Sequence, residues 1–420
     1  MEWESWIPVL YGNDPGEQKN QKQRYLKLAE NFKEKFGQQP RYWFSTPGRS
    51  EIGGNHTDHN HGRVLAASVN LDAVAAVSPT DDENILIYSE GFDRPFTVAL
   101  NDLIKKEGEI GTTSALIRGI AAKLKDLGLT IGGFKAYVES KVLPGSGLSS
   151  SATIEVLLGT IFNYLYNDGK IKPEVIAQIG QYSENHYFNK PCGLMDQMAC
   201  ALGGLLFIDF EEPAKPKFKK IELDLEKYGY RLLVVNTGGS HADLTSDYAS
   251  IPLEMKQVAK FFGKKVLRSI TIKDFLNNLP TLRKKVSDRA LLRAYHFLIE
   301  NERVLNQFKA LQNNDFESFL QLINESGASS LKWLQNIFTT KMPEEQSLTL
   351  ALALTENFIH QTGQGACRVH GGGFAGTIQV FLPTNFVESY RKLMEPVFGA
   401  QSVSVLQIRS HGTICLNVIS

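Results

Sequence analysis

Apolar and polar positions repeat along this chain with two different periods, which predicts a mixture of helices and strands. Apolar residues recur at helical spacing in six segments, at residues 17–38, 112–127, 150–166, 252–262, 285–312 and 345–361. Alternating or continuously apolar runs predict strands at residues 41–45, 63–78, 84–90, 94–100, 134–140, 230–236, 376–382 and 412–419. Because both kinds of element occur throughout the chain, we expect an α+β enzyme.

The length of the chain predicts two domains, because 420 residues exceed what one compact core usually holds. A polar stretch at residues 210–221, which contains the run Glu-Glu-Pro-Ala-Lys-Pro-Lys, interrupts two apolar segments. Such a composition is typical of a loop near a domain boundary. We therefore divide the chain into an N-terminal domain of residues 1–215 and a C-terminal domain of residues 216–420.

The charge balance argues against a nucleic-acid or membrane partner. The 45 Lys and Arg residues match the 45 Asp and Glu residues, so no overall field favours polyanions. No run approaches the ~18 consecutive apolar residues of a spanning helix, and the acidic start of the chain lacks the pattern of a secretory signal. The cysteines form no CxxC pair, which predicts reduced, mostly buried thiols in a cytoplasmic protein, at Cys192, Cys200, Cys367 and Cys415.

A segment rich in glycine and serine, residues 144–152, lies between a predicted strand and a predicted helix. Glycine lets backbone N–H groups approach an anion closely, and the start of a helix adds unpaired N–H groups and a favourable dipole. The segment therefore suits the phosphates of a nucleotide, although it lacks the Gly-Lys-Ser/Thr ending of a Walker A loop. A serine-capped helix after a flexible turn explains the fragment, taken alone, equally well.

Residues 47–62 concentrate three histidines, two acids and an arginine in a short stretch. The flanking glycines indicate a tight, irregular loop, in which His56, His59 and His61 share no regular helical face. These side chains suit hydrogen bonds to a polyhydroxylated ligand. A metal site made of histidines and an aspartate and a solvated turn are the alternative interpretations.

Two further segments carry candidate chemistry. Asp196 stands among apolar residues, where a desolvated carboxylate needs a partner such as Arg49. A helix-capping role for Asp196 is the alternative.

Three consecutive glycines at residues 371–373 precede an apolar strand. They permit close approach of the backbone to a ligand or to another loop, although a flexible hairpin explains them almost as well.

Taken together and in this order, the four segments resemble the galactokinases, in the superfamily that also contains homoserine, mevalonate and phosphomevalonate kinases. The stretches that match the family motifs lie at residues 48–60, 144–152, 191–197 and 365–376. Residues 235–237 and 247–248 resemble the sugar-facing strand and helix start of the family's second domain. The resemblance extends from near residue 40 to the C-terminus.

This resemblance implies an N-terminal ribosomal protein S5 domain 2-like domain, a C-terminal ferredoxin-like domain and an active site in the cleft between them. It implies ATP and Mg²⁺ as cofactors. The reaction it implies is phosphorylation of the anomeric hydroxyl of a galactose-like sugar to give a sugar 1-phosphate. We expect a monomer that acts on these small molecules, with neither nucleic acid nor membrane as a partner.

The same resemblance assigns roles to single residues. Asp196 would be the catalytic base, and Arg49 would hold it ionised and offset charge on the transferring phosphoryl group. The loop that would bind ATP comprises Pro144, Gly145, Ser146, Gly147, Leu148, Ser149, Ser150 and Ser151. The Mg²⁺ ligands would be Ser151 and Glu184. The sugar contacts would be Asn55, His56, Asp58, Gly193 and Tyr248.

Several positions depart from the family pattern. In the first motif the family has Asn, Glu and Tyr where this chain has Glu51, Asn55 and His59. An amide in place of a carboxylate at residue 55 changes which sugar hydroxyls the site can satisfy. L-Arabinose and N-acetylgalactosamine are therefore alternative substrates. A sensor that binds sugar and ATP without turnover, and a kinase for an alcohol such as mevalonate or homoserine, are the other hypotheses.

Overall fold

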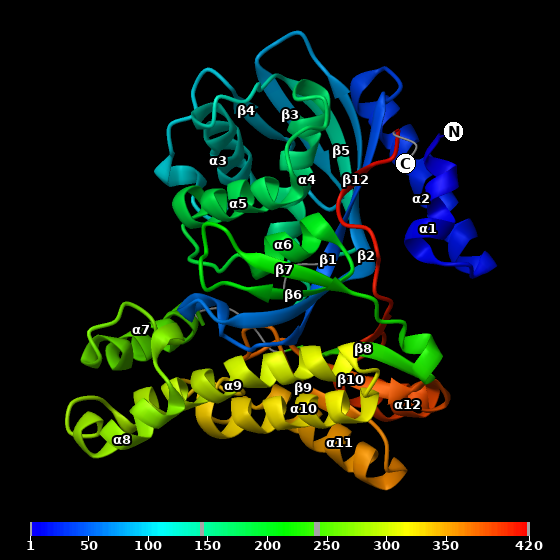
Figure 1. Cartoon of the computed structure of the whole chain (residues 1–420). Coiled ribbons are helices and arrows are strands. Elements are labelled where there is room, and N and C mark those ends of the chain that lie inside the picture. Colours follow the sequence, from blue (N-terminus) through cyan, green and yellow to red (C-terminus); the bar gives the residue numbers. More distant parts are fainter. Residues whose placement is uncertain (1, 143–146, 239–243, 418–420) are drawn as a thin grey trace.

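The computed structural model of this protein describes residues 2–142, 147–238 and 244–417. Within this part, two sheets and the helices packed on them confirm the predicted α+β class (Figure 1). One sheet has eight strands and the other has four. Helices α9 (Asp288–Gln312) and α10 (Phe316–Ser329) share one apolar cluster with residues of both sheets, so they join the two halves of the molecule.

The larger sheet is antiparallel except for the pairing of β3 with β5. Its main path runs β12-β1-β2-β5-β3-β4, while β6 pairs with the first part of β2 and β7 pairs with β6. The strands are β1 (Tyr42–Gly53), β2 (Arg63–Pro79), β3 (Asn84–Ser89), β4 (Phe96–Ala99), β5 (Phe134–Ser140), β6 (Leu205–Asp209), β7 (Lys217–Ile221) and β12 (Ile414–Cys415).

Helices cover both faces of the larger sheet, which explains why β2 reads as an almost continuous apolar run. Ala73, Ala75 and Val77 share a core with the helices of one face, and Val74 and Ala76 share another with the N-terminal helices. The first layer consists of α3 (Thr113–Asp126), α4 (Ser150–Tyr166), α5 (Pro173–Ser183) and α6 (Met195–Leu202). The N-terminal layer consists of α1 (Ile7–Tyr11) and α2 (Pro15–Phe36).

The smaller sheet is antiparallel throughout, in the order β11-β8-β10-β9. Leu232 and Val234 of β8 share a core with α9 and α10, whereas Leu233 and Val235 share one with α11 and α12. The strands are β8 (Tyr230–Asn236), β9 (Ala366–His370), β10 (Thr377–Pro383) and β11 (Val403–Leu406). The remaining helices are α7 (Thr245–Phe261), α8 (Ile272–Leu282), α11 (Ser347–Thr362) and α12 (Val387–Phe398).

The structure corrects the prediction of an irregular loop over the whole of residues 47–62. β1 continues to Gly53, with shifts of register after Pro47 and after Glu51. The polar side chains in this part of β1 are buried, because their hydrogen-bond partners come from other elements. The alternation of apolar and exposed polar residues that marks a half-exposed strand is therefore missing here. An irregular connection is found at residues 54–62, which include the short helix η2 (Asp58–Asn60).

The predicted division after residue 215 does not coincide with the division between the sheets. β7 and β12 lie beyond residue 215, yet both belong to the larger sheet. Figure 1 shows the C-terminal segment, in red, running back from the second sheet to place β12 beside β1. The polar stretch near residue 215 hid β7 because this strand lies at the sheet edge, where lysines face solvent.

The other predicted helices and strands are found, most of them with ends shifted by a few residues, although the helix predicted from residue 252 begins at Thr245. Several elements went unpredicted, namely β6, β9, β11, α1, α5, α6, α8, α10 and α12. No helix in the described residues is long and apolar enough to cross a bilayer. All four cysteines are free, as predicted, and three of them are buried, Cys192 being half-buried.

Candidate active site

Arg49 connects three elements that are far apart in the sequence. Its Nε lies 2.6 Å from Oδ1 and its Nη2 lies 2.8 Å from Oδ2 of Asp196, which is in the first turn of α6. Its Nη1 donates to the carbonyl oxygen of Gly147 at 2.6 Å, and its backbone N–H donates to the carbonyl oxygen of Leu148 at 3.1 Å. The partner predicted for Asp196 is the one found, in the two-pronged geometry of a strong charge-assisted pair.

Asp196 is held in its ionised form. Burial alone would raise the pKa of its carboxyl group, but the charge of Arg49 and hydrogen bonds from Arg49 and Ser149 outweigh this effect and lower the pKa below its ordinary value. The side chain of Asp196 is nevertheless 30% exposed. An ionised carboxylate with one open side is able to accept a proton from a ligand.

The described part of the predicted phosphate loop turns sharply into α4. Gly147 has a φ of 74°, and a Cβ atom there would lie 2.3 Å from Oγ1 of Thr377. Ser149 precedes α4 in the left-handed conformation, with φ 61° and ψ 62°. The first N–H groups of α4 have no partner within the helix, and the bond from Ser149 to Asp196 brings this helix start to the Arg49–Asp196 pair.

The other residues predicted to bind ATP are distributed as follows. Leu148 is buried and contributes to the apolar core beneath the loop. Ser150 and Ser151 are the first two residues of α4. Three residues lie outside the described part of the chain, namely Pro144, Gly145 and Ser146.

Ser151 and Glu184 lie together, as a shared metal site requires. The hydroxyl of Ser151 donates to Oε1 of Glu184 at 2.8 Å. Glu184 begins a π-helical turn, η4 (Glu184–Phe188), and its Oε2 accepts from Nε2 of Gln197 at 3.0 Å. One hydroxyl and one carboxylate, supplemented by phosphate oxygens and water, form the kind of oxygen set that Mg²⁺ prefers. These residues therefore fit the predicted ion.

Asp58 lies against the segment that leads into α6. A Cβ atom at residue 193 would lie only 1.7 Å from Oδ2 of Asp58, so glycine is required at Gly193 for this carboxylate to occupy its place. Oδ1 of Asp58 accepts from the backbone N–H of His59 at 2.9 Å. Two of the predicted sugar contacts, Asp58 and Gly193, are thus neighbours in space, and Gly193 lies shortly before Asp196 in the sequence.

His56 and Tyr248 both contact the glycine turn at residues 371–373. Nε2 of His56 lies 3.0 Å from the carbonyl oxygen of Gly372, and the hydroxyl of Tyr248 donates to the carbonyl oxygen of Gly373 at 2.9 Å. Burial, and to a lesser degree His59, lowers the pKa of His56 to about 3, so the ring is neutral. Its Nε2 then donates to Gly372, and its buried Nδ1 is an acceptor that has no partner among the described residues.

Asn55 is a correction to the predicted set of sugar contacts. The side chain is fully buried. Its Nδ2 donates to Oε1 of Glu51 at 2.9 Å and to the carbonyl oxygen of Gly371 at 2.7 Å. Its Oδ1 accepts from Ser330 at 3.2 Å and from Asn336 at 2.8 Å. The amide makes its full set of four hydrogen bonds within the protein, so none is left for a substrate.

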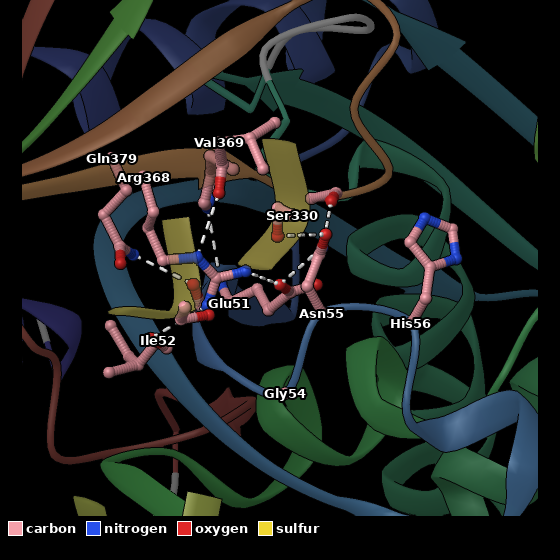
Figure 2. A network of polar contacts seen from close by, with 12 residues as sticks. Glu51, Ile52, Gly54, Asn55, His56, Ser330, Arg368, Val369 and Gln379 are labelled. Atoms are coloured by element: carbon pink, nitrogen blue, oxygen red, sulfur yellow. Dashed lines mark hydrogen bonds and ion pairs between the residues drawn. The ribbon is translucent and has the colours of Figure 1, made fainter. Parts of the chain in front are cut away.

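Figure 2 shows that Asn55 belongs to a buried polar network between β1 and β9. Arg368 pairs with Oε1 of Glu51 and donates to the carbonyl oxygen of Ile52 at 3.2 Å. Gln379 of β10 donates to the carbonyl oxygen of Glu51 at 3.0 Å. The two motif residues that have exchanged acid and amide relative to the family pattern are therefore bonded to each other and anchored to the second sheet.

His370, the last residue of β9, is also part of the structure that supports the site. Its Nε2 accepts from the backbone N–H of Glu51 at 3.3 Å, and its Nδ1 lies 3.0 Å from Oγ1 of Thr377. Burial and then the charges of Arg49 and Arg368 lower the pKa of His370 well below its usual value, so the ring is neutral.

The metal-site interpretation of the histidines at residues 56–61 gains no support, because the described residues contain no group of three or more His, Cys, Asp or Glu side chains placed to hold an ion.

Comparison with known proteins agrees with this geometry. The galactokinase galactose-binding signature matches residues 30–79, and the N-terminal domain of GHMP kinases matches residues 115–204. A galactokinase from Streptomyces coelicolor is 30% identical over 385 residues, which are 91% of this chain and 95% of that protein. The chain belongs to the galactokinase family. It is accordingly an ATP-dependent sugar kinase.

A solved structure extends the similarity to the galactokinase fold over most of the chain. The crystal structure of Lactococcus lactis galactokinase complexed with galactose aligns with a TM-score of 0.80 and 26% identity, over 93% of this chain and 99% of that one. Mevalonate kinase from Methanococcus jannaschii aligns with a TM-score of 0.60 and 17% identity, over 87% of this chain and 98% of that one. The latter likeness shows the shared GHMP kinase fold alone.

Sequence reasoning missed three residues that the structure brings to this galactokinase-like site. Arg368 was counted only as part of a glycine-rich motif, although the exchange of Glu51 and Asn55 signalled a new partner for the carboxylate. Gln197 bridges the carboxylates of Glu184 and Glu155, which no local pattern indicates. Lys190 contacts Glu184 across a turn that is not helical in its spacing, so periodicity does not reveal it.

Proposed function

We propose that this protein transfers the γ-phosphoryl group of ATP to the anomeric hydroxyl of galactose, or of a closely similar sugar, and releases a sugar 1-phosphate and ADP. The observation that carries the proposal is the Arg49–Asp196 pair, which lies between the start of α4 and the segment that contains Gly193. This position puts a proton acceptor between a suitable phosphate site and a suitable sugar site.

In the proposed reaction Asp196 accepts the proton of the acceptor hydroxyl. The hydroxyl oxygen forms a bond to the γ-phosphorus, the bond between that phosphorus and the bridging oxygen breaks, and ADP leaves with the electron pair. Arg49 keeps Asp196 ionised and faces the charge that develops on the phosphoryl oxygens. Phosphoryl transfer depends mainly on such positioning and charge compensation.

Ser151 and Glu184 would hold Mg²⁺ in the proposed complex. The ion would supply positive charge to the phosphate oxygens while it is bound. The remaining work falls to residues of the chain. The N–H groups at the start of α4 bind phosphate oxygens, and the turn at Gly147 lets the backbone approach them.

Four residues are proposed to contact the sugar, namely His56, Asp58, Gly193 and Tyr248. Nδ1 of His56, for which the described part of the chain offers no partner, suits a hydroxyl donor, and the carboxylate of Asp58 suits one or two more. The Lactococcus relative is described in complex with galactose, which favours galactose as the sugar. We further propose that the protein acts in the cytoplasm, in line with its free cysteines. We also propose that it is a monomer.

A substrate panel tests this proposal. ADP release is measured with ATP, Mg²⁺ and, in separate assays, galactose, L-arabinose, N-acetylgalactosamine, glucose, mevalonate and homoserine. We expect the highest kcat/KM with galactose, and a product that has lost its reducing end because the phosphate occupies the anomeric position. Turnover restricted to mevalonate or homoserine, or binding of sugar and ATP without ADP release, would contradict the proposal.

A further inference from the structure

Lys190 is held beside the proposed metal site by the geometry of one turn. The π-helical turn η4 is followed by Asn189, which adopts the left-handed conformation with φ 67° and ψ 33°. The chain therefore doubles back, and the backbone N–H of Lys190 donates to the carbonyl oxygen of Glu184 at 3.1 Å. The backbone N–H of Cys192 donates to Oδ1 of Asn185 at 2.7 Å and fixes the segment that follows.

This turn brings an ammonium group onto the carboxylate of Glu184. Nζ of Lys190 lies 3.1 Å from Oε1, the same oxygen that accepts from Ser151. The side chain of Glu184 is 3% exposed, whereas that of Lys190 is 59% exposed. The ammonium group thus covers the carboxylate from its open side. Ser151 and Gln197, which also bond to Glu184, are neutral.

The positive charge of Lys190 also affects the pKa values of Asp196 and Tyr248. It contributes to the lowered pKa of Asp196, after the larger effects of burial, Arg49 and Ser149. It also partly offsets the effect of burial on Tyr248, whose pKa is raised to about 12. Lys190 contacts the proposed metal ligand, and its charge also acts on the proposed base and on a proposed sugar contact.

We propose that Lys190 binds a non-bridging phosphate oxygen of the nucleotide, an inference that rests on the proposed function. In this structure its ammonium group neutralises Glu184. When the nucleotide binds, whether or not a cation accompanies it, the ammonium group turns on its flexible four-carbon stem so that one of its three N–H groups meets a phosphate oxygen. It donates a hydrogen bond there and transfers no proton, and it offsets the negative charge that passes to the leaving ADP.

A purely structural brace is the alternative role. In that case Lys190 would hold Glu184 in place and never touch the nucleotide. The two roles differ in one measurable respect once the carboxylate of Glu184 is removed. In a Glu184→Gln protein no carboxylate is left there to repel the phosphates, so only the phosphate-binding role makes the affinity for metal-free ATP depend on the charge of residue 190. Adenosine has no phosphates, so its affinity is independent of that charge in both roles.

The test compares the full-length Glu184→Gln variant with the same variant carrying Lys190→Met, Lys190→Gln or Lys190→Arg. Lys170→Met in the same background is the control, because Lys170 is an exposed lysine paired with Asp168 on the surface and its loss changes the net charge equally. Calorimetry measures binding of ATP and of adenosine in the presence of EDTA. We expect ATP affinity to fall about tenfold in Lys190→Met and Lys190→Gln, as for a lost charge-assisted contact, and to change little in Lys190→Arg.

The proposal is overturned if adding Lys190→Met to a folded Glu184→Gln variant leaves its affinity for metal-free ATP unchanged. It is also overturned if Lys170→Met loses as much affinity, or if adenosine binding falls in parallel. As a second readout, the Mg²⁺-dependent reaction is expected to lose kcat or raise the KM for ATP in Lys190→Met, while the KM for sugar stays within about threefold, because residue 190 would contact only the nucleotide.

The same experiments separate this proposal from the proposed function. A tenfold loss of ATP affinity when Lys190→Met is added to Glu184→Gln, together with no turnover of any sugar by wild type, would support Lys190 as a phosphate ligand and reject the substrate assignment. Turnover of galactose by wild type with unchanged ATP binding in the variant would do the reverse.

Discussion

At the scale of single residues, the proposed chemistry depends on a carboxylate that stays charged in a largely closed site. Asp196 achieves this through two contacts with Arg49 and one with Ser149. Arg49 in turn is fixed by the carbonyl oxygen of Gly147. The base, its counter-ion and the start of the phosphate loop therefore form one unit, and a change in any of them alters the others.

Replacement of Asp196 by asparagine tests its role as base. The amide retains the size of the side chain but cannot accept the hydroxyl proton, so we expect kcat to fall by about 10²–10⁴-fold or more. Binding of ATP, measured by calorimetry, is expected to persist because the first turn of α4 is unchanged. Residual activity above a tenth of wild type would show that Asp196 is not the base.

The pH dependence of activity follows from the lowered pKa of Asp196. A base is active above its pKa, so wild-type kcat should stay level as the pH falls from neutrality and decline only below the ordinary range of a carboxyl group, about 3.9. Arg49→Lys removes the two-pronged contact while burial persists, which raises the pKa of Asp196. The acid limb of the kcat profile should therefore move to higher pH in this variant, and an unmoved limb would contradict the pairing.

At the scale of elements, the site consists of the starts of helices, which lie around an irregular part of β1. The shift of register in β1 accompanies the turn of Arg49 toward α6, as β-bulges commonly re-aim side chains near active sites. The start of α4 supplies the phosphate site, and the π-helical turn η4 supplies Glu184 and Lys190. None of these features belongs to the regular middle of a helix or strand.

Gly147 joins the phosphate loop to the second sheet. Alanine at this position would have a strained positive φ and a Cβ atom 2.3 Å from Oγ1 of Thr377. Gly128→Ala is the matched control, since Gly128 has a φ of 72° but no atom within 4 Å of the added Cβ. We expect Gly147→Ala to raise the KM for ATP at least about tenfold by displacing the loop, and Gly128→Ala to leave it unchanged. Equal effects would assign the change to backbone strain alone.

At the scale of the whole molecule, the two sheets are joined by buried polar contacts as well as by α9 and α10. Glu51 of β1 pairs with Arg368 of β9, and both side chains are almost completely buried. Asn55, Gln379 and His370 complete the network on either side. Because Asn55 and Arg49 lie on the same segment as Glu51, this network fixes the position of the proposed catalytic strand relative to the second sheet.

Removal of one member of the Glu51–Arg368 pair leaves a buried charge without its counter-ion. We expect Arg368→Met to lower the free energy of unfolding by about 3–5 kcal/mol, and the double variant with Glu51→Gln to lose less than the sum of the two single changes. Urea unfolding of the four proteins measures both effects. Arg283→Met serves as the control, because Arg283 and Asp288 form an exposed pair that contributes at most about 1 kcal/mol. Additive losses would show that the pair is uncoupled.

The sequence by itself determined the α+β class, most of the long elements and the family. Helical and alternating apolar patterns are local, so α2, α4, α9 and β2 could be read from short windows. The motifs around Arg49, Ser151 and Asp196 were also recognisable, because phosphate binding and proton transfer each require particular residue types at short spacing. The pairing of Asp196 with Arg49 followed from the electrostatic cost of an isolated buried carboxylate.

Only the tertiary structure decided which polar residues face the site and which support it. Asn55 was predicted to meet the sugar, but its hydrogen bonds go to Glu51, Gly371, Ser330 and Asn336, which follow or precede it by up to 316 positions. The hydrogen-bond partners of a side chain are set by packing between distant segments, and a local pattern does not contain that information. For the same physical reason the contact of Lys190 with Glu184, and the return of β12 to the first sheet, became visible only in three dimensions.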